Sequence, residues 1–218
     1  MNIARYIILF CLSVLGSLAI ADASAAELKA FRDAELIKSD ANDGDSFLVK
    51  TDGERLHLRL YYVDCPEIKA SRKYDLRRLR EQARYFGLVD EKRAIHFGKR
   101  AKRFTESQLE KPFTVYTAHA KAPGGSGSQR FYAFVATADG EYLDRLLVKN
   151  GLARAHGIGR GTPDGIHRDE MKDTLADMEA VAMLTRSGIW GETDPERVAE
   201  LRKQMRKEER ELKELDCN

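Results

Sequence analysis

One stretch near the start of the chain, residues 43–67, constrains the fold most strongly. It reads DGDSFLVKTDGERLHLRLYYVDCPE, and its Asp52-Gly53 pair separates two runs in which apolar and polar residues alternate. An Asp-Gly pair in this context is the strongest short signal for a β-hairpin. Side chains alternate along a strand, so the return run 54–63 presents its leucines on one face and His57, Arg59 and Tyr61 on the other.

The hairpin carries charged residues at its open end. Asp45 precedes the first strand, Asp64 follows the second, and Arg59 and Glu67 are near in sequence. Two carboxylates brought together repel each other unless a cation lies between them, and oxygen ligands suit calcium or magnesium better than zinc. An arginine beside such a metal is suited to hold a phosphate. The stretch therefore predicts a metal and phosphate site, and the alternative is a polar turn with solvated charges.

The segments DGDS and RLYYVDCPE, residues 43–46 and 59–67, resemble the signature of the staphylococcal nuclease (thermonuclease-like) family. The resemblance covers roughly residues 34–191. It implies an OB-fold barrel with helices packed on it and calcium-dependent cleavage of DNA and RNA on the 5′-oxygen side, which leaves 3′-phosphate ends.

The expected fold class is α+β: a five-stranded OB-fold β-barrel with about three packed helices, an inserted basic helix and a charged C-terminal helix. The nuclease-like domain is expected over 34–191, with a basic helical insertion at 68–93 and a charged helical tail at 192–218. The expected strands are 34–39, 46–50, 54–63, 113–118 and 130–137. The expected packed helices are 94–109, 142–151 and 169–186.

The site residues follow from the residue types and from the resemblance. Asp45, Asp64 and the Cys65 backbone carbonyl are expected to bind calcium, and Asp43 is expected to form the turn and support these ligands. Glu67 is placed to position a water or accept its proton. Arg59 and Arg130 are expected to clamp the phosphate; the resemblance aligns Arg130 with the second catalytic arginine of the family. Since neither arginine is expected in the core, replacing either should barely change folding.

Cations greatly outnumber acids over residues 69–103. Such an excess beside a phosphate-sized site predicts a track for nucleic acid through Arg77, Arg78 and Arg80. The alternative is a solvated helix face, which is common. The resemblance gives no role to this insertion.

The N-terminus has the pattern of a secretory signal peptide over residues 1–26: Arg5, an apolar run from 7 to 20, and small residues at 21–25. The protein is therefore expected to be exported to the periplasm or outside the cell, without stable membrane association; an uncleaved anchor is the alternative. Cys65 and Cys217 would then remain, and whether they form a disulfide stays open. A monomer is expected, and near-heptad apolar residues at 198–215 leave a coiled-coil dimer as the alternative.

A different class of function stays open: a non-catalytic OB-fold module that binds nucleic acid or a protein, since fold alone does not give function. A pure binder needs no metal pair beside two arginines and a further carboxylate. The five residues Asp45, Arg59, Asp64, Glu67 and Arg130 therefore favour a nuclease. The sequence does not distinguish DNA from RNA.

Overall fold

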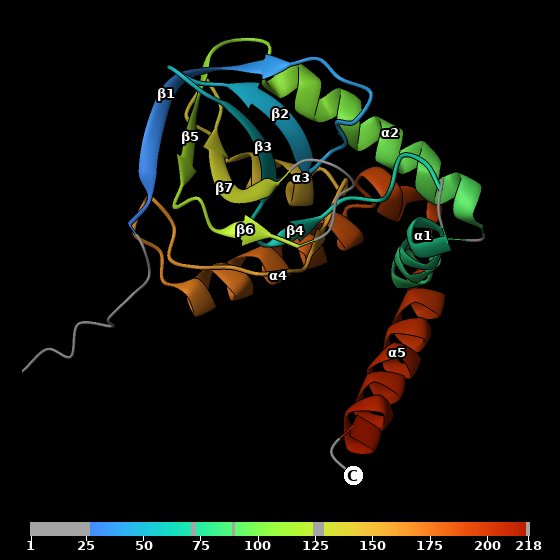
Figure 1. Cartoon of the computed structure of the whole chain (residues 1–218). Helices are drawn as coiled ribbons and strands as arrows, with labels where there is room; N and C mark the ends of the chain where they lie inside the picture. Colours follow the sequence, from blue (N-terminus) through green and yellow to red (C-terminus); the bar gives the residue numbers. More distant parts are fainter. Residues whose placement is uncertain (1–26, 71–72, 89, 124–128, 217–218) are drawn as a thin grey trace, which may run out of the picture.

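The structure is a computed structural model, which describes residues 27–70, 73–88, 90–123 and 129–216. It confirms the mixed α+β class: a curled sheet lies at one side, with helices below and beside it (Figure 1). Among the residues so described, no helix combines the length and the apolarity needed to cross a bilayer. The predicted signal peptide, 1–26, lies outside this part of the chain.

Five strands pair in a closed ring, the arrangement expected of an OB-type barrel. Antiparallel pairings join β1 to β2, β2 to β3, β1 to β5 and β5 to β7, and a parallel pairing of β3 with β7 closes the ring. The short β6 also pairs with β7, and β4 pairs with β8 in a separate two-stranded sheet. The strands are β1 (Lys29–Ile37), β2 (Ser46–Lys50), β3 (Arg55–Leu60), β4 (Val63–Asp64), β5 (Phe113–Thr117), β6 (Lys121–Ala122), β7 (Arg130–Ala136) and β8 (Arg154–Ala155).

The predicted hairpin forms as β2 and β3, and two strands of the sheet differ from their expected bounds. The leucines of β3 are buried as expected. The first strand of the sheet, β1, begins at Lys29 instead of the expected residue 34, because its N-terminal half pairs with β5. The return strand ends at Leu60, and Tyr62 follows with a positive φ of 65°. This turn starts the short strand β4 and buries Tyr61, which stacks on Tyr132.

Two hydrophobic cores stabilise the fold. The first fills the barrel and the space between the barrel and the helices α3 and α4. The second joins α1, α2, η1 and the start of α5 around Leu79, Phe86, Phe97, Trp190 and Val198. The helices are α1 (Lys73–Phe86), α2 (Glu91–Gln108), α3 (Leu143–Lys149), α4 (Arg168–Leu184), the 3-10 helix η1 (Gly188–Glu192) and α5 (Pro195–Asp216).

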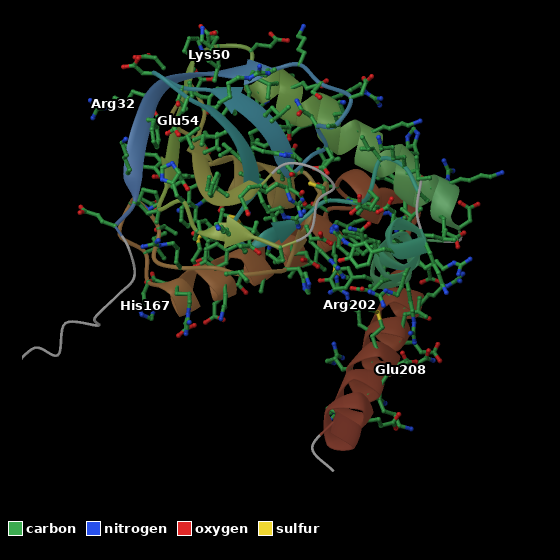
Figure 2. All side chains as sticks on the ribbon, viewed as in Figure 1. Arg32, Lys50, Glu54, His167, Arg202 and Glu208 are labelled. Atoms are coloured by element: carbon green, nitrogen blue, oxygen red, sulfur yellow. The ribbon has the colours of Figure 1, made fainter. Side chains whose placement is uncertain are left out.

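The C-terminal helix α5 extends away from the body but is anchored at its first turns (Figure 1). Val198 is fully buried, and Gly87, which ends α1 with a φ of 68°, leaves room for it. Farther along α5, Arg202 lies near the body and Glu208 pairs with Arg84 of α1 (Figure 2). The tail is thus docked onto the insertion.

A buried carboxylate, Glu179 of α4, connects four elements. It accepts hydrogen bonds from the Tyr85 hydroxyl of α1 at 2.6 Å and from the Ala155 N–H of β8 at 2.7 Å. Arg202 of α5 donates to the same carboxylate, and its guanidinium lies over the Tyr85 and Trp190 rings. Glu179 therefore links the inserted helix α1 and the C-terminal helix α5 to α4 and β8.

Replacing Glu179 with alanine should lower the free energy of unfolding by roughly 2–4 kcal/mol, because the change leaves the partly buried guanidinium of Arg202 and the partly buried N–H of Ala155 without their partner. Denaturant titration of the parent and the variant measures this. Glu170→Ala on the exposed face of the same helix serves as control and should stay within about 0.5 kcal/mol of the parent. A Glu179→Ala variant whose free energy of unfolding equals that of the control would contradict the role given to this residue.

Candidate active site

The Asp43-Gly44-Asp45 turn directs Asp45 inward. The Asp43 carboxylate Oδ1 accepts the backbone N–H groups of Asp45 at 3.1 Å and Ser46 at 2.7 Å, as expected for the residue that forms the turn. The Asp45 carbonyl accepts the Leu60 N–H at 2.8 Å, which ties the turn to the end of β3. The Asp45 side chain is consequently only 1% exposed.

The guanidinium of Arg59 lies between the two aspartates of the hairpin. Its Nη1 is 2.6 Å from Asp45 Oδ1, and its Nη2 is 2.9 Å from Asp64 Oδ1. The Cys65 N–H donates to the other oxygen of Asp45 at 2.6 Å. The hairpin therefore brings both carboxylates to one positive group. Arg59 is only 14% exposed and pairs with two buried carboxylates, so its side chain is more buried than expected, and we now expect its removal to destabilise the fold.

Asp64 is held by four donors, and three of them lie outside the predicted site. Arg59 and Arg78 both reach Oδ1, the latter at 2.7 Å, while Gln82 Nε2 and Arg154 Nε reach Oδ2 at 2.9 Å each. An ionised carboxylate offers about four lone-pair positions. All of the hydrogen-bonding capacity of Asp64 is thus used by the protein itself.

The inserted helix α1 supports the loop 64–67 directly. Gln82 is fully buried; its Oε1 accepts the Glu67 N–H at 2.9 Å, and its Nε2 also donates to the Cys65 carbonyl at 2.9 Å. Arg78 Nη1 pairs with Glu67 Oε1 at 2.7 Å. On the other side of the loop, Gly98 of α2 permits close approach, because a Cβ there would lie 2.4 Å from the Pro66 carbonyl oxygen.

These contacts correct the predicted nucleic-acid track. Arg78 is not part of an exposed track, because its guanidinium turns toward Asp64 and Glu67. Arg77 and Arg80 are exposed; Arg77 lies over the Tyr74 ring, and Arg80 pairs with Glu91. These two therefore remain candidates for contacts with nucleic acid.

Gln82 and Arg154 are not among the predicted site residues, and Arg78 lies beside Asp64 instead of in the predicted nucleic-acid track. The helical spacing of Arg78, Gln82 and Tyr85 puts them on one face of α1, and a glutamine within that face was a usable signal. Arg154 gives no such signal, since it reaches the site through the long-range pairing of β8 with β4, where it lies opposite Asp64.

The two aspartates differ in their electrostatics. Burial raises the pKa of Asp45 well above its usual value, and the neighbouring Asp43 adds to this against the opposing effect of Arg59. Burial alone would also raise the pKa of Asp64, but Arg59, Arg154 and Arg78 together lower it below its usual value. Burial raises the pKa of Glu67, with partial compensation by Arg78. Arginines therefore compensate the negative charge of Asp43 and Asp45 less than that of Asp64.

Arg130 lies on β7, the strand that pairs with β3. It opens β7, where it is in register with His57 of β3. Its Nη1 is 3.4 Å from the Ser46 hydroxyl and its Nη2 donates to the Pro123 carbonyl at 2.6 Å. Within the described part of the chain its buried Nε has no hydrogen-bond partner. The structure thus joins Asp45, Arg59, Asp64 and Glu67 in one cluster and places Arg130 next to the turn that carries Asp45.

The donor types at this cluster fit a hard divalent cation. Two carboxylates converge on one positive group, and the candidate ligand atoms of Asp45, Asp64 and Cys65 are all oxygens. Over the described ranges, no group of three or more His, Cys, Asp or Glu side chains is arranged for a metal ion. The carboxylates would therefore need backbone oxygens and water to complete a coordination sphere, as calcium sites commonly have.

The question of a disulfide between Cys65 and Cys217 stays open. Cys65 is buried next to the site, and burial raises the pKa of its thiol well above the usual value. Cys217 lies outside the described residues.

Comparison with known proteins agrees with the geometry. The model of the family described as staphylococcal nuclease homologue matches residues 57–192, which include the last four residues of β3, the loop 64–67 and η1. An uncharacterized protein of Methanocaldococcus jannaschii is 28% identical over 152 residues, covering 68% of this chain and 67% of that protein. The family match spans more than half of the chain, and on this ground the chain belongs to the staphylococcal nuclease homologue family.

Proposed function

We propose that this protein is an exported, calcium-dependent nuclease that hydrolyses phosphodiester bonds of DNA or RNA. The observation that carries the proposal is the cluster of Asp45, Arg59, Asp64 and Glu67, with both aspartates facing one guanidinium. The family supports a nuclease-type activity and binding of nucleic acid. The signal-like N-terminal sequence supports export to the periplasm or the outside of the cell.

Phosphodiester hydrolysis requires an activated water and stabilisation of the charge that grows on the phosphoryl oxygens. Asp45, Asp64 and the Cys65 carbonyl would hold calcium, which when bound would supply a positive charge for a phosphoryl oxygen and for the attacking water. Asp43 would keep Asp45 in place through the turn.

The remaining residues of the site have separate tasks. Glu67, which is 18% exposed, would orient the water or accept its proton. Arg59 and Arg130 would bind the other phosphoryl oxygens with paired hydrogen bonds that strengthen in the transition state. Among the residues that the structure describes, the Nε of Arg130 has no hydrogen-bond partner, and this supports its role as a donor to phosphate. The family resemblance further suggests products with 3′-phosphate ends, and exposed Arg77 and Arg80 would contact more distant phosphates.

Calcium should support cleavage of single-stranded DNA and should also raise the melting temperature, because a ligand that binds only the folded state stabilises it, by about 2.7 kcal/mol at 100 times Kd. Gel assays and thermal melts with calcium or with a chelator measure both effects. Asp45→Asn should lose the calcium-dependent rise in melting temperature. Cleavage that continues undiminished in chelator would refute the calcium assignment.

A further inference from the structure

Arg78 is the least buried of the four groups that hold Asp64. Its side chain is 24% exposed, compared with 14% for Arg59 and 6% for Arg154, and Gln82 is fully buried. Of these groups, Arg78 therefore has the most freedom to change its rotamer.

The other three donors are also fixed by partners other than Asp64. Arg59 pairs with Asp45, and Arg154 pairs with Glu81 and lies over the Tyr85 ring. Gln82 uses its amide to bind the backbone of the loop 64–67. Within the described part of the chain, both ion pairs of Arg78 go to site carboxylates, those of Asp64 and Glu67. Releasing Arg78 would thus leave the rest of the cluster intact.

The occupancy of Asp64 makes such a release necessary for any cation that uses this carboxylate. Four donors fill its lone-pair positions, whereas Asp45 accepts from the single guanidinium of Arg59 and from the Cys65 N–H. The helix that carries Arg78 need not move, because Leu79 and Phe86 anchor it in the second core. Only the long side chain of Arg78 must turn.

Building on the proposed function, we infer that Arg78 is a displaceable counter-ion of the metal site. A divalent cation and the Arg78 guanidinium compete for Asp64, and the cation binds when Arg78 leaves the carboxylate. The displaced guanidinium remains at the mouth of the site, where the scissile phosphate supplies a new anionic partner. The inserted helix α1 thus tunes the cation affinity of the site through Arg78.

Calorimetric titration of calcium into the full-length protein without nucleic acid tests this competition. Arg78→Ala and Arg78→Gln should each bind calcium roughly tenfold more tightly than the parent, which corresponds to about 1.4 kcal/mol of removed competition. Lys73→Ala removes the same charge from an exposed position on the same helix. It controls for the general effect of net charge and should change the affinity much less.

Equal or weaker calcium binding by both Arg78 variants, with clear binding by the parent, would overturn the inference and make Arg78 a fixed part of the site. An equal gain in Lys73→Ala would also overturn it, since net charge alone would then explain the effect. A parent that binds no calcium refutes the inference together with the calcium part of the proposed function. These results are distinguishable because the parent is titrated in every experiment.

Discussion

Replacing Arg59 with alanine is expected to reduce turnover on single-stranded DNA by about 100-fold or more, as other losses of a charge-stabilising donor do. The same change should lower stability by roughly 3 kcal/mol in chelator, because it leaves the buried Asp45 without its guanidinium partner. Arg59→Lys should recover little of the turnover, since a point ammonium cannot bridge two carboxylates or grip a phosphate with two parallel hydrogen bonds.

Arg130→Ala is the comparison that separates catalysis from folding. Arg130 contacts Ser46 and the Pro123 carbonyl, so its loss should reduce turnover by about 100-fold or more while the melting temperature stays near that of the parent. Turnover and thermal melts of both variants measure this. An Arg130→Ala variant with parental melting and near-parental turnover would show that this arginine is not catalytic.

Glu67→Gln should also reduce turnover strongly, by about 100-fold or more if Glu67 acts as the general base. The amide keeps the size of the side chain and an oxygen for Arg78, but it cannot accept a proton from water. The measurement is kcat on single-stranded DNA at saturating calcium, together with the calcium-induced rise in melting temperature to show that the metal still binds.

Glu81→Gln is the matched control for Glu67→Gln. Glu81 lies on α1 in the same charged network, where it pairs with Arg154, but it is 49% exposed. The variant removes the same charge close to the site and should change kcat far less than Glu67→Gln. Equal losses in the two variants would mean that the local charge matters and that Glu67 has no specific role as a base.

The local parts of this site could be predicted from the sequence. Asp52-Gly53 and the alternation around it define the hairpin, and the hairpin determines that Asp45, Arg59 and Asp64 meet at its open end. Glu67 follows within three residues. The place of Arg130 at the start of a strand was also predictable, because the apolar run after it predicts that strand.

The remaining parts depend on contacts between distant segments. Nothing local indicates that Arg154 pairs in register with Asp64, or that Glu179 of α4 receives donors from α1, β8 and α5. The charge of α1 predicts a nucleic-acid track or, alternatively, a solvated helix face, yet Gln82 and Arg78 of that helix bind the loop 64–67. Strict alternation places Tyr61 on the face opposite the leucines, with His57 and Arg59, but this alternation ends where Tyr62 turns the chain with a positive φ.

One assay on the parent protein with a 5′-labelled single-stranded DNA shows directly whether the protein is a calcium-dependent nuclease. Binding is measured in chelator by electrophoretic mobility, and calcium is then added to the same samples. Calcium is expected to convert the bound DNA to shorter products that carry 3′-phosphate ends. A protein that binds the DNA and leaves it intact after calcium is added would contradict the nuclease assignment and favour a non-catalytic binding module.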